Sequence, residues 1–319
     1  MSDAAPGAAP HWSAMAERGL YWGLRICAAA LRLLGRRGSM VVVAPVALYF
    51  FLTGTEQRRA SRAFLARAFA AAGRNRAPTP LDGYRHFLAF AGRALDTFAA
   101  WTGGAGPVVA DDPEALRAVA ADPRGALFIV SHHGNVDLSR AVLDEATRRR
   151  LLLLVHTRHA VNYNRVLNEF NPQAAMNTLQ VTDLGPEAAI ALKERVEQGH
   201  WVVIAGDRTP VGSQGRVSTV PFLGHPAPFS QGPYIVASLL ECPVYLLFCR
   251  RDGHGHRLCI EKFAERVELP RRSRSDALAG YAAAYAARLE RQALADPFQW
   301  FNFFDFWASE KEATNDALR

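Results

Sequence analysis

Short apolar runs alternate with longer amphipathic stretches over the second part of the chain, from residue 126 onward. The runs are rich in Val, Leu and Ile, which is typical of buried strands, and the longer stretches have the periodicity of helices. Strands that alternate with helices predict an α/β fold with a mostly parallel central sheet flanked by helices. We expect strands at residues 126–131, 151–156, 178–182, 201–205, 217–222, 243–249 and 257–261, and helices at 138–147, 160–169, 186–198, 230–240 and 274–295.

The first part of the chain has a helical pattern instead. Residues 12–35 predict an amphipathic helix with aromatic side chains of the kind found at membrane interfaces. Residues 40–52 form a 13-residue apolar run, broken by Pro45, which is too short to span a bilayer and could be re-entrant or buried. Two further helices are predicted at residues 55–72 and 79–100.

Basic residues are concentrated in this first part. The chain of 319 residues has a formal net charge of +7, and residues 1–76 contain eleven arginines, no lysine and three acidic residues, a net charge of +8. A basic segment with an apolar helix face suits an anionic membrane surface, although that face could instead pack on a soluble domain. No zinc finger or RNA-binding signature is present, so nucleic acid is not an expected partner. We expect a basic, amphipathic helical segment over residues 1–76 and an α/β domain over residues 77–319.

The cysteines and the first ten residues indicate the cellular compartment in which the protein folds. Cys27, Cys242, Cys249 and Cys259 form no CxxC pair and no zinc-ligand spacing with the histidines, so we expect reduced thiols and no metal site. The first ten residues contain Asp3 and lack the pattern of a secretory signal. These features predict a cytosolic environment for the α/β domain.

The residue types needed for acid–base chemistry follow the first apolar run. Residues 131–137 read Ser-His-His-Gly-Asn-Val-Asp, where a strand is predicted to end and a helix to begin. Open α/β sheets place their sites at the carboxyl ends of strands. The carboxylate of Asp137 on one imidazole nitrogen of His132 would leave the other nitrogen free as a base. The alternatives are that Asp137 only caps the helix, or that His133 is the base.

Polar residues also follow other predicted strands. Arg158 ends one of them and Asn162 lies in the helix after it, while Asp207 and Arg208 follow the strand at residues 201–205. Because the carboxyl ends of parallel strands share one edge of a sheet, these groups could converge with the histidine turn. A substrate anion is one partner for the arginines, and an ordinary salt bridge between Arg208 and Asp207 is the alternative.

The order of these blocks resembles the lysophospholipid acyltransferase superfamily, in particular the branch that contains the lipid A lauroyl and myristoyl acyltransferases. His132 and Asp137 match the HX4D signature of that superfamily. The resemblance covers about residues 120–307 and implies a glycerolipid-acyltransferase-like fold. The other matching blocks, in chain order, are Arg158 with Asn162, Gly199 to Arg208, Phe222-Leu223-Gly224, Ser230-Gln231-Gly232, Pro243-Val244 and Pro297-Phe298-Gln299-Trp300.

Departures from that branch bear on the acceptor. Asp137 stands where the branch usually has Glu, Arg208 replaces an expected Gln, and the segment after Trp300 lacks a basic pair. The missing basic pair argues against a heavily phosphorylated acceptor such as lipid A. The chain looks more like a set of bacterial acyltransferases, related to this branch, whose acceptors are diverse.

The resemblance implies transfer of an acyl group from a thioester of acyl carrier protein or CoA to a hydroxyl of a lipid or other amphiphilic acceptor, without a metal or other cofactor. It implies that His132 is the general base and Asp137 its orienting partner, while N–H groups near Gly134 or Gly206 could stabilise the oxyanion. It also implies peripheral binding to the cytoplasmic face of the bacterial inner membrane, without a spanning helix. The substrate-binding residues that it implies are Arg158, Asn162, Asp207, Arg208, Phe222 and Gly224.

Two other classes of function stay open from the sequence. One is a hydrolase that uses the same dyad on a lipid ester or thioester, and the other is a non-catalytic lipid-binding protein. The chain has no Gly-x-Ser-x-Gly elbow, which disfavours a serine hydrolase. The intact His/Asp pair disfavours a decayed site.

Overall fold

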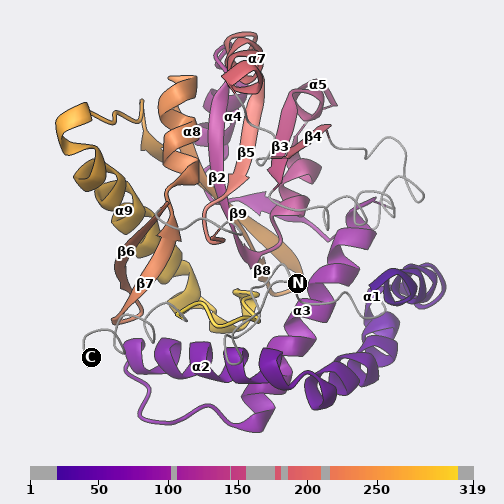
Figure 1. Cartoon of the computed structure of the whole chain (residues 1–319). Coiled ribbons are helices and arrows are strands. Elements are labelled where there is room, and N and C mark those ends of the chain that lie inside the picture. Colours follow the sequence, from indigo (N-terminus) through magenta and orange to yellow (C-terminus); the bar gives the residue numbers. More distant parts are fainter. Residues whose placement is uncertain are drawn as a thin grey trace, which may run out of the picture.

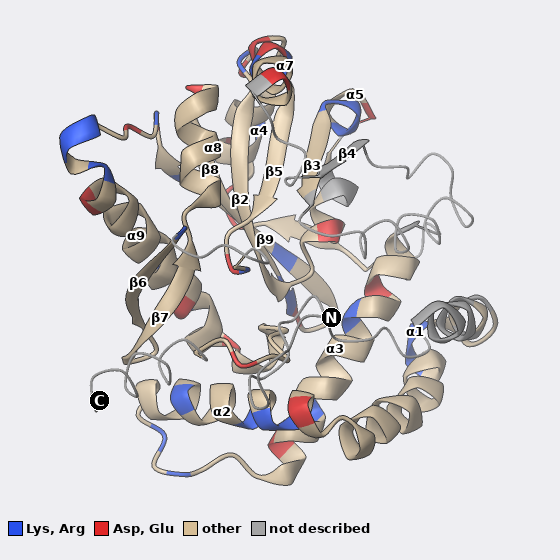
Figure 2. Cartoon of the chain, viewed as in Figure 1, with Lys and Arg blue, Asp and Glu red and all other residues tan. Residues whose placement is uncertain are grey.

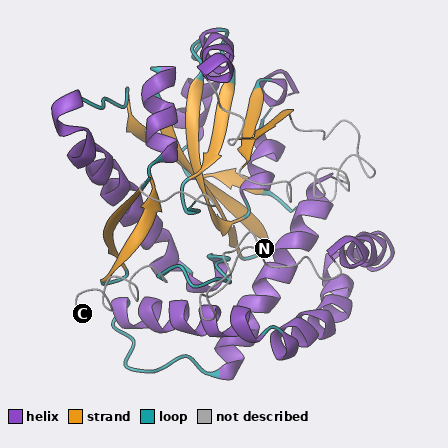
Figure 3. Cartoon of the chain, viewed as in Figure 1, coloured by secondary structure: helices purple, strands orange, loops and turns teal. Residues whose placement is uncertain are grey.

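Seven strands form one central sheet in the computed structural model, which describes residues 20–101, 106–143, 145–155, 177–180, 186–209 and 216–307. Their order is β1-β9-β8-β2-β5-β3-β4, and neighbouring strands are parallel except β8 and β9. This sheet, with helices around it, confirms the α/β prediction (Figure 1, Figure 3). The strands are β1 (Val108–Ala110), β2 (Ala126–Gly134), β3 (Leu151–Val155), β4 (Asn177–Gln180), β5 (Trp201–Ala205), β8 (Val244–Asp252) and β9 (Gly255–Ala264), and β6 (Val217–Phe222) with β7 (His225–Ser230) forms a separate hairpin.

Helices cover the sheet and also lie beyond its carboxyl edge. In Figure 1, α2 runs across that edge, and the segment after α9 lies between α2 and the strands. The predicted helix at residues 160–169 falls outside the described residues. The helices are α1 (Leu20–Thr53), α2 (Thr55–Ala71), α3 (Pro80–Trp101), α4 (Pro113–Ala121), α5 (Glu145–Arg149), α7 (Pro186–Glu197), α8 (Gly232–Leu240) and α9 (Arg274–Ala295), with 3-10 helices η2 (Val136–Val142), η5 (Arg271–Ser273) and η6 (Pro297–Gln299).

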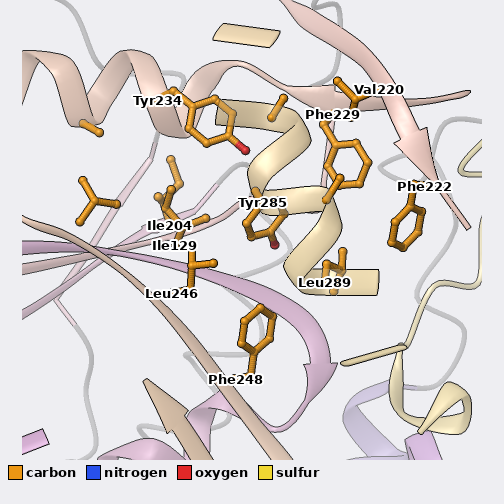
Figure 4. Packing of buried hydrophobic residues seen from close by; sticks show 14 of the residues in the cluster. Ile129, Ile204, Val220, Phe222, Phe229, Tyr234, Leu246, Phe248, Tyr285 and Leu289 are labelled. Atoms are coloured by element: carbon orange, nitrogen blue, oxygen red, sulfur yellow. The ribbon is translucent and has the colours of Figure 1, made fainter. Parts of the chain in front are cut away.

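Strand β2 lies in the middle of the sheet, and both of its faces are apolar. Leu127 and Ile129 point into a core that also contains residues of α8 and α9, whereas Phe128 and Val130 point into a second core on the side of α4. Successive side chains of a strand alternate between faces, so a continuous apolar run is what a strand buried on both sides requires. Figure 4 shows Tyr285 of α9 directed at the sheet beside Ile129.

The sequence missed the second strand of the β6–β7 hairpin. Pro226 and Pro228 lie in β7, and prolines argue against a strand inside a sheet because they cannot donate a ladder hydrogen bond. Here β6 and β7 pair only with each other among the described residues, so their outer edges tolerate proline. The two-residue turn between them has positive φ at both positions, 53° at Leu223 and 78° at Gly224, as a tight hairpin turn requires. The short elements β1 and α4 were missed as well.

The predicted α-helix at residues 138–147 is not observed as one continuous α-helix. The chain has the 3-10 helix η2 over Val136–Val142 and then the short α5 over Glu145–Arg149. Short polar side chains explain the difference, because they compete for backbone groups and weaken a regular α-helix. The Ser139 hydroxyl, for example, donates to the carbonyl oxygen of Val136 at 2.7 Å.

The apolar run near the N-terminus belongs to a longer helix than predicted. Helix α1 bends at Gly35, where φ is 61° and ψ is −178°, and it continues through Pro45. Leu33–Thr53, 21 residues long, is the one stretch in the described part of the chain that is long and apolar enough to cross a membrane, judged by length and composition alone. Packing on α3 holds the helix together at the proline. The buried residues of this packed face are Val43, Ala47 and Phe51.

Helix α2 shares its core with the α/β domain. Phe64, Leu65 and Phe69 of α2 are fully buried in the cluster that contains β2, β5 and α9. A polar link adds to this packing: the fully buried His86 of α3 accepts from the Ser61 hydroxyl at 2.8 Å through Nδ1 and donates to the carbonyl oxygen of Trp300 at 2.9 Å through Nε2. Burial lowers the pKa of His86 to about 4, so this imidazole is neutral.

Candidate active site

The two histidines lie near the carboxyl end of β2, which runs on to Gly134 and not only to residue 131. Because they are neighbours in an extended strand, His132 and His133 point to opposite sides. Gly134 has a φ of 71°, and a Cβ atom there would lie 2.1 Å from the carbonyl oxygen of Cys249. Only glycine fits where β2 passes β8, and the chain turns into η2 after this point.

Asp207 is the carboxylate that holds His132. It follows β5, which pairs with β2, so two adjacent strand ends bring the residues together. Asp207 Oδ1 lies 2.8 Å from His132 Nδ1, and Oδ2 accepts from the backbone N–H of His132 at 2.8 Å and from Trp300 Nε1 at 2.9 Å. The Asp207 side chain is 0% exposed, while that of His132 is 36% exposed. A carboxylate at Nδ1 makes this nitrogen a donor and leaves the Nε2 lone pair free.

The charges around this pair favour a neutral base beside an ionised carboxylate. Burial raises the pKa of Asp207, but His132, Arg208 and the hydrogen bonds lower it by more than burial raises it. The pKa of Asp207 therefore lies well below its usual range. Burial lowers the pKa of His132, and Arg208 adds to this decrease while Asp207 opposes it. At neutral pH, His132 can therefore accept a proton.

Asp137 has a different partner from the one predicted. Its carboxylate lies in η2 and forms an ion pair with Arg93 of α3 at 3.4 Å, and 17% of its side chain is exposed. The structure thus differs from the pairing predicted from the spacing at one nitrogen: Asp207, and not Asp137, holds Nδ1 of His132. The spacing of the motif suggested a turn directly after His132, but β2 continues to Gly134 and brings Asp137 to α3.

His133, the alternative base, is fully buried. Its Nε2 donates to the carbonyl oxygen of Asp296 at 3.1 Å. Burial lowers its pKa to about 4. An imidazole in this position ties β2 to the segment after α9 and is not accessible to a substrate, which favours His132 as the candidate base.

A comparison with protein families shows which family the chain matches. The model of the bacterial lipid A biosynthesis acyltransferases matches residues 91–309, which is more than half of the chain. The chain belongs to this family. No curated protein matches it. The resemblance seen in the sequence is therefore confirmed, and the matched region begins within α3 and contains His132, Asp137 and Asp207.

Trp300 is a residue of the candidate site that sequence reasoning missed. It was recognised only as part of a closing motif, yet its indole N–H binds Asp207 and its ring is fully buried among Phe64, Phe222 and Phe306. A tryptophan inside an apolar stretch needs a partner for its single N–H donor. That requirement was the available signal, but the sequence does not show which acceptor meets it.

Asn135 is a second residue of the acyltransferase that the sequence did not single out. It is 2% exposed, and its Nδ2 donates to the Thr97 hydroxyl at 2.8 Å and to the carbonyl oxygen of Arg93 at 3.2 Å. These bonds fasten the turn after the histidines to α3. The register of α3 relative to β2 thus determines where Arg93 meets Asp137.

Arg208 of the acyltransferase is bound by groups of the protein itself. Its Nη1 lies 2.9 Å from the carbonyl oxygen and 3.5 Å from the carboxylate of Asp207, and its Nη2 donates to the carbonyl oxygen of Phe301 at 3.1 Å. The residue is only 8% exposed. The structure thus supports the alternative of a salt bridge, in which Arg208 positions Asp207 and the segment after Trp300.

The remaining predicted residues fall into three groups. Phe222 is fully buried in the aromatic cluster and Gly224 lies in the hairpin turn, so their roles in the structure are packing and turning. The N–H of Gly206 donates to the carbonyl oxygen of Val130 at 2.9 Å, which removes this donor from the oxyanion candidates. Arg158 and Asn162 lie outside the described residues.

Proposed function

We propose that this acyltransferase moves an acyl group from a thioester of acyl carrier protein or CoA to a hydroxyl of a lipid or other amphiphilic acceptor, with His132 as general base. The observation that carries the proposal is the 2.8 Å contact between His132 Nδ1 and Asp207 Oδ1. The carboxylate is fully buried and the imidazole partly exposed, so the pair presents Nε2 to a substrate while its orienting partner stays dry.

The proposed reaction is a single acyl transfer. Nε2 of His132 takes the proton of the acceptor hydroxyl as that oxygen attacks the thioester carbonyl carbon. The Asp207 carboxylate stabilises the imidazolium that forms. When the tetrahedral intermediate collapses, the C–S bond breaks and the imidazolium returns the proton to the thiolate, which gives an ester and a free thiol. Gly134 is the remaining glycine candidate for an oxyanion N–H.

A transfer assay tests this proposal against the two other classes of function. Full-length protein is incubated with acyl carrier protein that bears a radiolabelled acyl chain, with and without a bacterial lipid extract. A labelled lipid product supports the transferase, free fatty acid released at the same rate in both samples indicates a hydrolase, and neither product indicates a lipid-binding protein. Loss of general-base catalysis in His132→Ala should lower the rate by ~10²–10⁴.

His200 provides the control for that variant. It lies just before β5, at the opposite end of the sheet, and its side chain bonds only to the carbonyl oxygen of Arg195 among the described residues. His200→Ala should retain the wild-type rate. Near-normal transfer by a folded His132→Ala protein would exclude His132 as the base.

We further propose that α1 holds the enzyme against a membrane. The helix is compatible with membrane association, and one side of it exposes large apolar side chains. Residues 38–53 of α1, which follow Arg36 and Arg37, contain no charged residue, while α2 beside them carries several basic ones (Figure 2). Because the opposite side packs on α3, we favour a helix that lies on the cytoplasmic face of the inner membrane over one that crosses it. The most exposed of these side chains are Leu33, Leu34, Val41, Leu48, Tyr49 and Leu52.

Sedimentation with vesicles tests the role of α1. The double variant Leu48→Glu, Leu52→Glu places two carboxylates on the exposed side, and it should strongly reduce the fraction that pellets with anionic vesicles at low salt. Ile190→Glu is the matched control, because Ile190 is 61% exposed on α7 at the other end of the sheet. If both variants pelleted to the same extent, the exposed side of α1 would not be the membrane-binding surface.

A further inference from the structure

A cavity of about 400 Å³ lies beside the candidate active site. It is enclosed by α1, α3, the end of β8 and the segment after α9, and it reaches Gly134 and Asn135, two and three positions beyond His132. This volume suits a small organic group rather than a single ion. Apolar side chains form part of the wall. The charged residues that line it are Arg36, Arg85, Arg93, Arg251, Asp96 and Asp296.

The charges of this cavity do not balance. Asp96 is 5% exposed and is bound by Arg36 through both oxygens, by Arg251 Nη1 at 2.9 Å and by His256 Nε2 at 3.4 Å. One carboxylate thus faces two guanidinium groups. Four arginines against two aspartates leave two positive charges in the lining, and one remains if Asp137, the partner of Arg93, is counted too. An anion would complete this arrangement.

Two polar nitrogen atoms of the cavity residues also lack partners. Arg93 Nε and His256 Nδ1 are buried and have no hydrogen-bond partner within the described part of the chain. A guanidinium nitrogen of this kind is always a donor, and leaving it unsatisfied in the interior costs free energy. Buried polar atoms without a partner are uncommon in proteins, and a ligand that supplies an oxygen atom is a direct explanation for the donor Arg93 Nε.

The cavity also adjoins the proposed membrane surface. Arg36 and Met40 of α1 line it, and the same helix exposes Val41 and Leu48 away from the protein. A molecule with its chain in a bilayer under α1 would therefore have its head group level with the arginines. The distance from the head group to the histidine turn is then short, because Gly134 belongs to the same wall.

We propose that this cavity binds the single anionic head group, a phosphate or a carboxylate, of the amphiphilic acceptor. That the bound molecule is the acceptor rests on the proposed function, but binding of the anion does not depend on catalysis. The arginines hold the anion and the apolar wall takes the first carbons of the chain. A hydroxyl on the same molecule then reaches His132.

Binding of dodecyl phosphate to the full-length protein, measured by titration calorimetry below its micelle concentration, tests the proposal. We expect it to bind at least tenfold more tightly than the neutral dodecyl maltoside and than inorganic phosphate. Arg93→Gln and Arg85→Gln should each weaken it about tenfold. Arg85 is exposed, so its removal does not threaten the fold. Arg117→Gln, at an exposed position of α4, is the matched control and should bind normally.

Each of the other outcomes would overturn the proposal. Equal binding of inorganic phosphate would show a site for a free anion and not for an amphiphile. Equal binding of dodecyl maltoside, or normal binding by both arginine variants, would show that the charges play no part. His132→Ala separates the inference from the proposed function: it should bind dodecyl phosphate like the wild type although it transfers no acyl group. Tight binding together with a wild-type protein that never transfers would refute only the proposed function.

Discussion

The two ends of the central sheet use charged residues in opposite ways. At the amino end, ion pairs such as Arg124 with Glu265 join loops at the surface, and both of these side chains are 57% exposed. At the carboxyl end, Asp207 is 0% exposed and accepts from His132 and Trp300. The same types of residue are therefore solvated at one end and buried at the other.

The difference agrees with the proposal that the site lies at the carboxyl end of the sheet. Exposed ion pairs contribute little because water screens them. A buried carboxylate is stable only when its partners are in place, so removing one partner has a large effect. A fold that needed charges only for solubility would keep them at its surface. The buried set at the carboxyl end is instead what a preorganised site requires.

Asp207→Asn should produce the largest change after the loss of His132 itself. The amide keeps the shape of the side chain, but its NH2 group can face Nδ1 and so move the hydrogen of His132 to Nε2, which abolishes the base. We expect the transfer rate to fall by about 10³ to 10⁴. The rate under saturating donor is the measurement, with circular dichroism to check the fold. A rate within threefold of wild type would remove Asp207 from the mechanism.

Trp300→Phe should have an intermediate effect, about tenfold on the rate. Without the indole N–H, the Asp207 carboxylate has one donor fewer and attracts the imidazolium more strongly, which raises the pKa of His132. The rate needs neutral His132 and falls as the pH drops below this pKa, which in the wild type lies below its ordinary value. The acid limb of the pH–rate profile should therefore move to higher pH in the variant.

Trp307→Phe is the matched control for the tryptophan. Trp307 lies in the same aromatic cluster, 3% exposed, and its Nε1 has no hydrogen-bond partner among the described residues. Both variants lose a similar amount of packing, but only Trp300→Phe loses a bond to Asp207. If both lower the melting temperature equally and neither moves the acid limb, Trp300 has a purely structural role.

Asp137→Asn should have the smallest effect at the carboxyl end, about threefold or less, because the partly exposed pair with Arg93 is screened. Arg124→Gln at the amino end gives the baseline and should leave the rate unchanged. The measurement is the rate ratio of Asp137→Asn to Asp207→Asn. If the transfer rate fell further in Asp137→Asn than in Asp207→Asn, Asp137 and not Asp207 would be the functional partner of His132.

The elements with a strong periodic pattern were predicted well. The apolar run that became β2 is buried on both faces, and those that became β3 and β5 are buried on one face and at least partly buried on the other. Pattern and packing therefore agree, and the helix at residues 274–295 was placed at its observed bounds. The prolines of β7 concealed a strand because a local rule excluded it, and only its position at a free edge makes it possible. The length of α1 was underestimated because packing on α3 overrides the helix-breaking tendency of Pro45.

Two residues of the candidate site were named from the sequence, but their contact with each other was not. His132 and Asp207 were both selected, since strand ends mark the functional edge of such a sheet. Their contact joins residues 75 positions apart, and it depends on the register of β2 against β5. Local spacing favoured Asp137 because it is near His132 in sequence. Strand β2 instead extends three residues beyond its predicted end, so that His132 meets Asp207 and Asp137 meets Arg93 of α3.

The buried imidazole of His86 has a consequence for how the protein unfolds. It bonds to Ser61 of α2 and to the carbonyl of Trp300, whose indole holds Asp207. Helix α2 precedes the region that matches the family, yet it cannot separate from the domain without leaving Nδ1 of His86 unsatisfied and removing Phe64 from the ring of Trp300. We therefore expect the backbone amides of α2 and of the turn after β5 to share one free energy of opening in hydrogen exchange.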